Sequence, residues 1–295
     1  MNQKIKVAVV GIGSWGKNLL RAFNEQAEVK YACHNGSQRS RNEVAKYPDI
    51  RSTTNLYEAL NNKAVRAVVI ATPTPTHKKI AMAALQAGKH VFLEKPGGRN
   101  YRELEEIATE ADRRKLKVAL GYEFVWHPAL QWLKKRLKPE DILEMHFCWT
   151  KWGTFHDHPI PHLVSHTISM AMGLGFKKFA LNETVVYGVV SETDIVHARL
   201  LLEDEVDFEI HIDRATPGTK FRCLKIITRD GGYIWHNDEL SQFEKGNEKL
   251  KGVTLPPVTA VAAEVSNFLD AVRNGRRPVV DDRFGLEVWR VIEKI

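Results

Sequence analysis

The chain has 295 residues and a formal net charge of +7, and 43% of its residues are hydrophobic while 27% are charged. A chain of this length can bury a full core and is expected to form two domains. The composition is that of a globular protein, and no run approaches the roughly 18 apolar residues of a membrane helix. We therefore expect no membrane association. Because a strand begins directly after the first four residues, we also expect no signal peptide.

The net positive charge indicates which binding partners to expect, and the cysteines indicate the cellular compartment. Lys and Arg are interspersed with Glu, as in residues 102–106, and no basic stripe with interleaved aromatic residues is present. This pattern argues against nucleic-acid binding, although a basic field would attract an anionic cofactor or substrate. Arg214 is one candidate for binding an anionic substrate group, but a surface ion pair is the commoner arrangement. Cys33, Cys148 and Cys223 lack CxxC spacing, which predicts reduced thiols in a cytoplasmic protein.

Strands alternate with helices as far as residue 121. The expected strands cover residues 5–10, 29–33, 66–71, 89–93 and 117–120, and the expected helices cover residues 15–26, 41–46, 55–60, 76–86 and 101–114. This alternation predicts βαβ units and a doubly wound parallel sheet. Residues 1–121 are therefore expected to form an α/β Rossmann dinucleotide-binding domain.

Consecutive strands with short turns follow residue 121. Helices are expected at residues 127–137, 162–172, 262–273 and 284–295, and strands at residues 142–149, 184–190, 196–202, 206–212, 221–228 and 232–235. The strand-rich run predicts an open, mainly antiparallel sheet, so residues 122–295 are expected to form an α+β domain for substrate binding and oligomerisation. We expect its last helix to be able to pack back on the first domain. An open sheet face also favours a homodimer or homotetramer.

The first strand runs directly into a GxGxxG loop that begins at Gly11. Gly11 permits a tight turn, Gly13 lets the backbone approach a pyrophosphate, and Gly16 lets the helix pack closely on the strand. The helix that follows directs its unpaired N–H groups and its positive dipole end at the phosphates. The loop therefore predicts a dinucleotide site that includes Ser14 and Trp15.

The segment after the second strand bears on the choice of cofactor. A fold that prefers NAD places an Asp or Glu about 20 residues beyond the glycine loop, where it binds the ribose 2′-hydroxyl. Residues 33–41 contain no acid. Ser37 and Arg39, with His34 nearby, could instead hold a 2′-phosphate, so we predict that NADP is preferred over NAD. The alternative is that Arg39 and Arg41 are solvated residues at a helix start and that selectivity is weak.

Residues 68–96, VVIATPTPTHKKIAMAALQAGKHVFLEKP, resemble the glucose–fructose oxidoreductase, inositol dehydrogenase and rhizopine catabolism (Gfo/Idh/MocA) family. The junction at residues 121–129, the stretch that ends at residues 166–169 and the segment 268–279 are also similar to that family. The resemblance implies an NAD(P)-dependent oxidoreductase that acts on a hydroxyl or ketone of a sugar, cyclitol or nucleotide sugar. It further implies that the cofactor is contacted by Ala71, Thr72, Pro73, Thr76, His77, Glu94 and Lys95.

The resemblance also implies roles for two catalytic residues. Lys95 would contact the reacting oxygen and the nicotinamide ribose, and His166 would act as acid and base. The family's helix usually carries an Asp four residues before this His, and here His162 holds that position. The residue chemistry agrees, because hydride transfer at a secondary alcohol needs a proton acceptor and a cation. His162 and His166 lie one turn apart and could reach one cleft, so both are candidate catalytic and substrate residues; either could also be a packing residue.

Several other interpretations remain open. Tyr122 and Trp152 could line a sugar site because aromatic faces pack on pyranose rings, yet both also suit a core. His156, Asp157 and His158 precede the helical histidines and could join a zinc site, but the HExxH glutamate is absent and no metal is predicted. A nucleophilic serine or cysteine hydrolase has no support in the sequence, since no G-x-S-x-G sequence occurs. The alternative to an enzyme is a non-catalytic dinucleotide-binding sensor or regulator with the same fold.

Overall fold

The computed structural model describes residues 4–155 and 157–295. The chain divides into two compact units, of which one comprises Met1–Glu123 and Thr259–Glu287. The other comprises Phe124–Val258 and Val288–Ile295. No helix among the described residues is long and apolar enough to cross a membrane.

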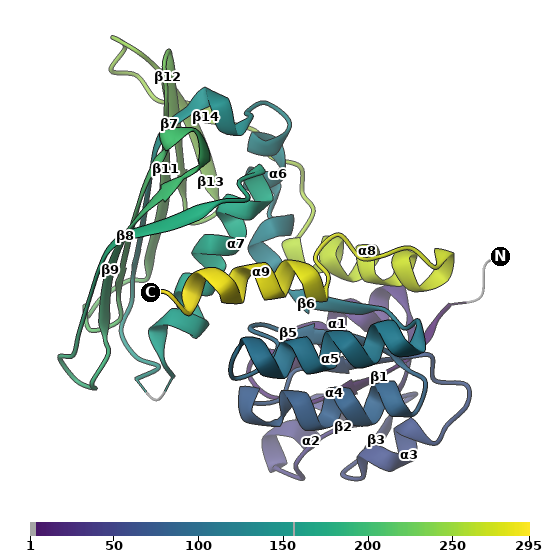
Figure 1. Ribbon diagram of the computed structural model, residues 1–295. Coiled ribbons are helices and arrows are strands. Elements are labelled where there is room, and N and C mark those ends of the chain that lie inside the picture. Colours follow the sequence, from purple (N-terminus) through teal and green to yellow (C-terminus); the bar gives the residue numbers. More distant parts are fainter. Residues whose placement is uncertain (1–3, 156) are drawn as a thin grey trace. The chain divides into compact units, whose positions relative to one another are not determined.

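The first unit is built on a six-stranded sheet in the order β3-β2-β1-β4-β5-β6 (Figure 1). Its strands are Lys6–Val10 (β1), Glu28–Cys33 (β2), Arg51–Thr53 (β3), Ala67–Ile70 (β4), His90–Glu94 (β5) and Val118–Gly121 (β6). Every neighbouring pair runs parallel. This is the strand order of the doubly wound dinucleotide-binding fold, so the predicted Rossmann fold is confirmed.

Helices cover both faces of the parallel sheet, which is why the strands β1, β4, β5 and β6 are almost continuously buried. They are Gly16–Gln26 (α1), Gln38–Val44 (α2), Leu56–Leu60 (α3), His77–Gln86 (α4), Tyr101–Arg114 (α5) and Ala260–Asn274 (α8). Phe23 of α1, Phe92 of β5 and Phe268 of α8 meet edge to face, with ring centroids 5.4–6.1 Å apart. Helix α8 thus shares a core with α1, although it follows the second sheet in sequence.

Helix α5 illustrates how local sequence determines an element. Leu104, Ile107 and Ala111 recur at helical spacing and are all buried. The Asn100 side chain caps the first turn by accepting the Glu103 N–H, and the helix ends at a left-handed residue. Strand β3, in contrast, is three polar residues at the sheet edge and has no apolar run that sequence patterning could detect.

The second unit holds an eight-stranded sheet in the order β14-β13-β12-β11-β7-β10-β9-β8. Its strands are Ile142–Thr150 (β7), Phe179–Tyr187 (β8), Ile195–Leu202 (β9), Asp207–Asp213 (β10), Phe221–Thr228 (β11), Gly231–His236 (β12), Glu239–Glu244 (β13) and Lys251–Val253 (β14). Only β7 and β10 pair in parallel, and the other neighbours are antiparallel. The expected mainly antiparallel sheet is confirmed, while β13 and β14 are additional strands whose polar residues concealed them.

One face of this sheet is covered and the other is open. Along β7, Phe147 and Trp149 are buried while His146 and Cys148 are partly exposed, because successive side chains point to opposite faces. The buried face packs against Pro128–Lys134 (α6) and Ser165–Leu174 (α7) (Figure 1). A single π-turn, Ile160–Val164, precedes α7 where a regular helix was expected. The last helix, Asp282–Ile292 (α9), runs in sequence from the first unit into the second.

Candidate dinucleotide site and catalytic residues

The loop after β1 requires glycine at two positions and leaves space at a third. Gly11 has φ +92°, and a Cβ there would lie 2.6 Å from the Ala71 carbonyl oxygen. A Cβ on Gly16 would lie 1.8 Å from the Gly11 carbonyl oxygen, so α1 could not approach the strand. A Cβ on Gly13 would meet nothing within 4 Å. The backbone at Gly13 therefore faces open space, as a pyrophosphate site requires.

A pocket of about 440 Å³ lies at the carboxyl ends of β1, β2 and β4. It brings together nine of the predicted cofactor residues: Gly11, Gly13, Ser14, His34, Ser37, Arg39, Ala71, Thr72 and Pro73. It is also lined by residues that sequence reasoning missed, including Asn35, Ser40, Thr54, Leu56 and Ile80. The other predicted residues, Trp15, Gly16, Thr76, His77, Glu94 and Lys95, are not among its lining residues.

The side of the pocket beyond β2 carries no acid. The Gly36 N–H donates to His34 Nδ1 at 3.0 Å, so the proton of the neutral ring is on Nε2, 2.8 Å from Ser52 Oγ. Burial lowers the pKa of His34, which favours this neutral form. No residue lining the pocket is Asp or Glu, and no described carboxylate forms an ion pair with Arg39. Ser37 and Arg39 both line this side of the pocket, and the Ser37 hydroxyl also donates to Ser40 Oγ at 3.0 Å.

Hydrogen bonds from two side chains, His77 and Thr76, stabilise the turn after β4. His77 is 1% exposed, and its Nε2 lies 2.7 Å from the Thr72 carbonyl oxygen. Burial lowers the pKa of His77 to about 4, so the ring is neutral near pH 7 and donates this hydrogen bond. The Thr76 hydroxyl lies 2.7 Å from that of Thr72. Both residues therefore position the turn at Thr72 and Pro73, which lines the pocket.

A buried carboxyl group ties the glycine loop to the end of β5. Trp15 Nε1 donates to Glu94 Oε1 at 2.5 Å, and Glu94 is 8% exposed. Burial raises the pKa of Glu94 to about 8, although Trp15 and Lys95 act in the opposite direction. Burial also raises the pKa of Glu264 on α8 well above its ordinary value, and the nearby Glu94 and Glu123 raise it further. Both buried carboxyl groups therefore hold their protons more tightly than an exposed carboxyl group does.

Lys95 follows β5 directly, at the carboxyl end of the sheet where ligands of this fold collect. Its peptide bond to Pro96 is cis. Lys95 is near enough to His77 for its charge to oppose protonation of that ring. The predicted catalytic cation therefore lies beside the Thr72 turn.

In the second unit, His166 lies in the first turn of α7 and is 6% exposed. Its ring meets Phe124 edge to face at a centroid distance of 4.9 Å and lies 6.0 Å from the ring of Trp149. The Arg222 guanidinium lies 4.2 Å from the Phe124 ring centroid. His166 is thus held in an aromatic, water-poor setting with a cation nearby.

His162 lies in the π-turn, a feature that often marks functional sites, and a third of its side chain is exposed. Its Nδ1 lies 4.0 Å from Asp157 Oδ2. Sequence reasoning considered Asp157 only as a metal ligand, and its proximity to His162 could not be read from the spacing. His156 lies outside the described residues. Among the residues that are described, no group of three or more side chains has the arrangement of a metal site.

The two aromatic candidates lie in different settings. Tyr122 is 0% exposed, and its ring packs 5.9 Å from that of Phe284. Trp152 is 54% exposed, with its ring edge to face with Phe155 at 5.1 Å. Trp152 is therefore accessible to a ligand, whereas the Tyr122 ring is enclosed.

Arg214 forms neither an anion site nor a surface ion pair. It is 1% exposed and its Nε lies 3.4 Å from Oδ1 of Asp194, which is fully buried. It also donates to the carbonyl oxygens of Thr154 at 2.6 Å and Thr193 at 2.8 Å. The expected surface pair is therefore wrong: Arg214 joins two loops inside the unit.

Comparison with known proteins identifies the family. A model described as "Oxidoreductase family, NAD-binding Rossmann fold" matches residues 5–122. A scyllo-inositol 2-dehydrogenase (NADP(+)) of Bacillus subtilis is 31% identical over 310 residues, covering 96% of this chain and 75% of the relative. The chain belongs to the Gfo/Idh/MocA family. A second relative of this chain, a UDP-N-acetylglucosamine 3-dehydrogenase of Acidithiobacillus ferrooxidans, is 25% identical over 291 residues, covering 94% of this chain and 91% of the relative.

Solved structures show the same fold over the full length. The crystallised UDP-N-acetylglucosamine 3-dehydrogenase of Acidithiobacillus ferrooxidans aligns with a TM-score of 0.88 at 22% identity, covering 100% of this chain and 97% of that one. A levoglucosan dehydrogenase, in complex with NADH and L-sorbose, aligns at 0.86 and 17% identity, covering 99% and 95%. This Gfo/Idh/MocA member is thus an NAD(P)-dependent oxidoreductase, and the non-catalytic alternative is not favoured.

Proposed function

We propose that this family member transfers hydride between NADP(H) and a secondary hydroxyl or ketone of a sugar, cyclitol or nucleotide sugar. The observation that carries the proposal is the Trp15–Glu94 hydrogen bond, because it joins the glycine loop of the dinucleotide pocket to the end of β5, which Lys95 follows. Relatives named for a cyclitol and a nucleotide sugar support this class of substrate.

The nicotinamide cofactor supplies the hydride acceptor or donor. In the oxidation direction the carbinol carbon loses a hydride and its hydroxyl loses a proton. Lys95 is proposed to hold the reacting oxygen and to stabilise its developing negative charge. His166 is proposed to accept the proton, and its aromatic surroundings fix the ring and keep water away. His162, with Asp157 near its Nδ1, is proposed to contact the substrate and to position this proton transfer.

The proposed preference for NADP rests on the acid-free side of the pocket. Without an Asp or Glu to bind a ribose 2′-hydroxyl, Ser37 and Arg39 are the groups that can meet a 2′-phosphate. Fluorescence titration with NADP⁺ and NAD⁺ tests this, with tighter binding of NADP⁺ expected. Arg39→Ala should weaken NADP⁺ binding and spare NAD⁺, whereas Lys46→Ala, at an exposed lysine paired with Glu43, should change neither. Tighter binding of NAD⁺ by the parent would contradict the proposal.

The substrate class can be tested directly. We would screen cyclitols, aldoses and UDP-sugars by thermal shift in the presence of NADP⁺ and then follow nicotinamide absorbance with each compound that binds. The proposal expects stoichiometric reduction of NADP⁺ by at least one of these classes. Cofactor binding without turnover across the whole panel would instead support a sensor or regulator.

We further propose that the protein is a cytoplasmic homodimer or homotetramer that binds neither nucleic acid nor membranes. Three free cysteines and the scattered basic residues support this, as does the open face of the eight-stranded sheet. Multi-angle light scattering measures the mass in solution. A monomer at micromolar concentration would refute the oligomer.

A further inference from the structure

Two lysines lie close together at one end of the eight-stranded sheet. Lys151 directly follows β7 and Lys220 directly precedes β11, and these two strands pair as far as those ends. Lys220 Nζ lies 5.0 Å from the Trp149 ring centroid, and the His166 ring lies 6.0 Å from the same centroid. Lys151 is two residues beyond Trp149, and its N–H still donates to the Asp213 carbonyl oxygen at 2.9 Å, as in a strand. Strand alternation therefore places Lys151 on the His166 side of the sheet as well.

Positive charge predominates around Lys151. Burial lowers the pKa of Lys151, the neighbouring charges of Lys220 and Arg214 lower it further, and Asp157 acts in the opposite direction. No carboxylate of the described residues forms an ion pair with Lys151, and Arg214 has its own partner in the buried Asp194. Because like charges at close range repel one another, an anion bound beside Lys151 would relieve this repulsion.

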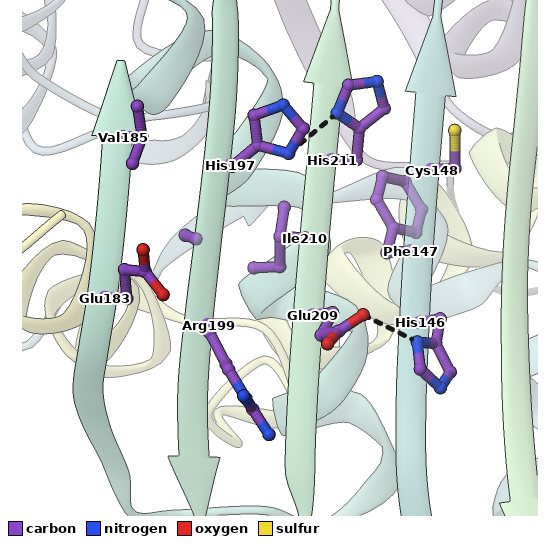
Figure 2. Close-up of a pocket in the computed structure, with 11 residues that line it drawn as sticks. His146, Phe147, Cys148, Glu183, Val185, His197, Arg199, Glu209, Ile210 and His211 are labelled. Carbon is purple, nitrogen blue, oxygen red and sulfur yellow. Dashed lines mark hydrogen bonds and ion pairs between the residues drawn. The ribbon is translucent and has the colours of Figure 1, made fainter.

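The open face of the same sheet has a different balance of charge. Its hollow of about 390 Å³ includes carboxylates beside its basic side chains (Figure 2). Arg199 Nε donates to Asp207 Oδ1 at 2.9 Å, and His146 Nδ1 lies 3.1 Å from Glu209 Oε2. That face also supports the proposed oligomer. The site for an anionic ligand is therefore to be sought at Lys151, beside His166, and not in this hollow.

We propose that Lys151 and Lys220 bind an anionic group of the substrate, a carboxylate or a phosphate, while the reacting hydroxyl lies at His166. The inference rests on the proposed function and narrows it. The substrate is an acidic sugar, a sugar phosphate or a nucleotide sugar, and neutral aldoses and cyclitols are poor substrates. Lysine suits this role because its ammonium group is a compact charge with three donors on a flexible stem.

The test compares compounds that share a sugar and differ in an anionic group. The pairs are glucuronate with glucose, glucose 6-phosphate with glucose, and UDP-N-acetylglucosamine with N-acetylglucosamine. Reduction of NADP⁺ gives kcat and KM for each compound. The charged member of at least one pair should have a kcat/KM at least about 100-fold above that of its neutral partner, because each lysine contributes a charge-assisted hydrogen bond. The pair that shows this preference identifies the anionic group.

Substitution of each lysine tests its part in this preference. Lys151→Gln and Lys220→Gln should each reduce the preference for the charged member by roughly 10–100-fold, mostly through KM. Lys220→Arg, which retains the positive charge, should keep most of the preference. Lys138→Gln, at an exposed lysine near Glu140 in the same unit, should keep all of it.

Binding measurements separate this inference from the proposed function. Calorimetry with the nicotinamide cofactor at saturation gives the affinity for the same compounds whether or not they are turned over. Equal kcat/KM for charged and neutral members would overturn the anion site and leave the proposed function standing. If no compound is turned over, the proposed function fails, and tighter binding of a charged member that both Gln variants weaken would still support the anion site. Binding that shows no preference for any charged member, or parent affinity in both Lys151→Gln and Lys220→Gln, would overturn it.

Discussion

Replacing the buried Glu94 with glutamine should make the protein less sensitive to rising pH. Glu94 is 8% exposed, and burial raises the pKa of its carboxyl group from 4.5 to about 8. The folded chain therefore holds this proton more tightly than the unfolded chain does. The resulting stabilisation is complete below pH 4.5 and is lost as the pH rises toward and through about 8.

The size of the effect follows from the shift. At about 1.4 kcal/mol per pKa unit, a rise from 4.5 to about 8 corresponds to roughly 5 kcal/mol of unfolding free energy. Because Glu264 is also buried and its charge is coupled to that of Glu94, we expect Glu94→Gln to recover about 2–4 kcal/mol at pH 8.5. The amide oxygen of glutamine can still accept the Trp15 N–H, so the variant should keep this contact.

Urea unfolding of the parent and of Glu94→Gln at intervals between pH 5 and 9, followed by circular dichroism, measures this difference. The two stabilities should converge near pH 5 and separate as the pH rises, with the variant more stable at the alkaline end. Glu43→Gln, at a residue whose partner is the exposed Lys46, serves as a control and should track the parent. Parallel curves for the parent and Glu94→Gln across this range would refute the inference that Glu94 is protonated in the folded state.

Three further outcomes follow from contacts in the two units. Arg214→Met should lower the free energy of unfolding by about 3–5 kcal/mol because it leaves the buried Asp194 uncompensated. Arg199→Met, at an exposed ion pair with Asp207, should lower it by no more than about 1 kcal/mol. Equal losses in urea unfolding would contradict this difference. Gly16→Ala should lower the free energy of unfolding by about 1–3 kcal/mol because its Cβ meets the backbone. Gly13→Ala should keep the parent melting temperature but bind the cofactor more weakly. The reverse pattern would contradict the roles assigned to Gly13 and Gly16. His162→Asp should shift the acid limb of the pH–rate profile without changing cofactor affinity, and superimposable profiles would place His162 outside the chemistry.

Much of the first unit could be predicted because its signals are local. The apolar strands, the glycine loop and the helical periodicity each occupy a short continuous stretch, and together they determine the parallel order. Strand β3 was not predicted because it has three polar residues, two of them exposed. Thr54 follows this strand, and without the strand its place beside the pocket could not be predicted. The Trp15–Glu94 contact joins residues 79 positions apart, so no local pattern could reveal it.

In the second unit, the alternation of apolar and polar residues predicted the sheet but not β13 and β14, the polar strands at one edge. The role of Arg214 could not be predicted because its partners come from loops separated in sequence and its burial depends on their closure. The Asp157–His162 contact likewise depends on the π-turn, a local departure from helix geometry that Pro161 alone does not specify.

The central claim is that Lys95 acts in hydride transfer at a cofactor site built by the glycine loop. The most direct measurement compares NADP⁺ reduction by the parent and by Lys95→Ala on a substrate identified in the sugar and cyclitol screen, with NADP⁺ affinity measured in parallel. The account predicts that Lys95→Ala keeps near-parent NADP⁺ affinity and the parent melting temperature, while turnover falls by roughly 10²–10³-fold or more. A Lys95→Ala variant that turns over at a near-parent rate would contradict the claim.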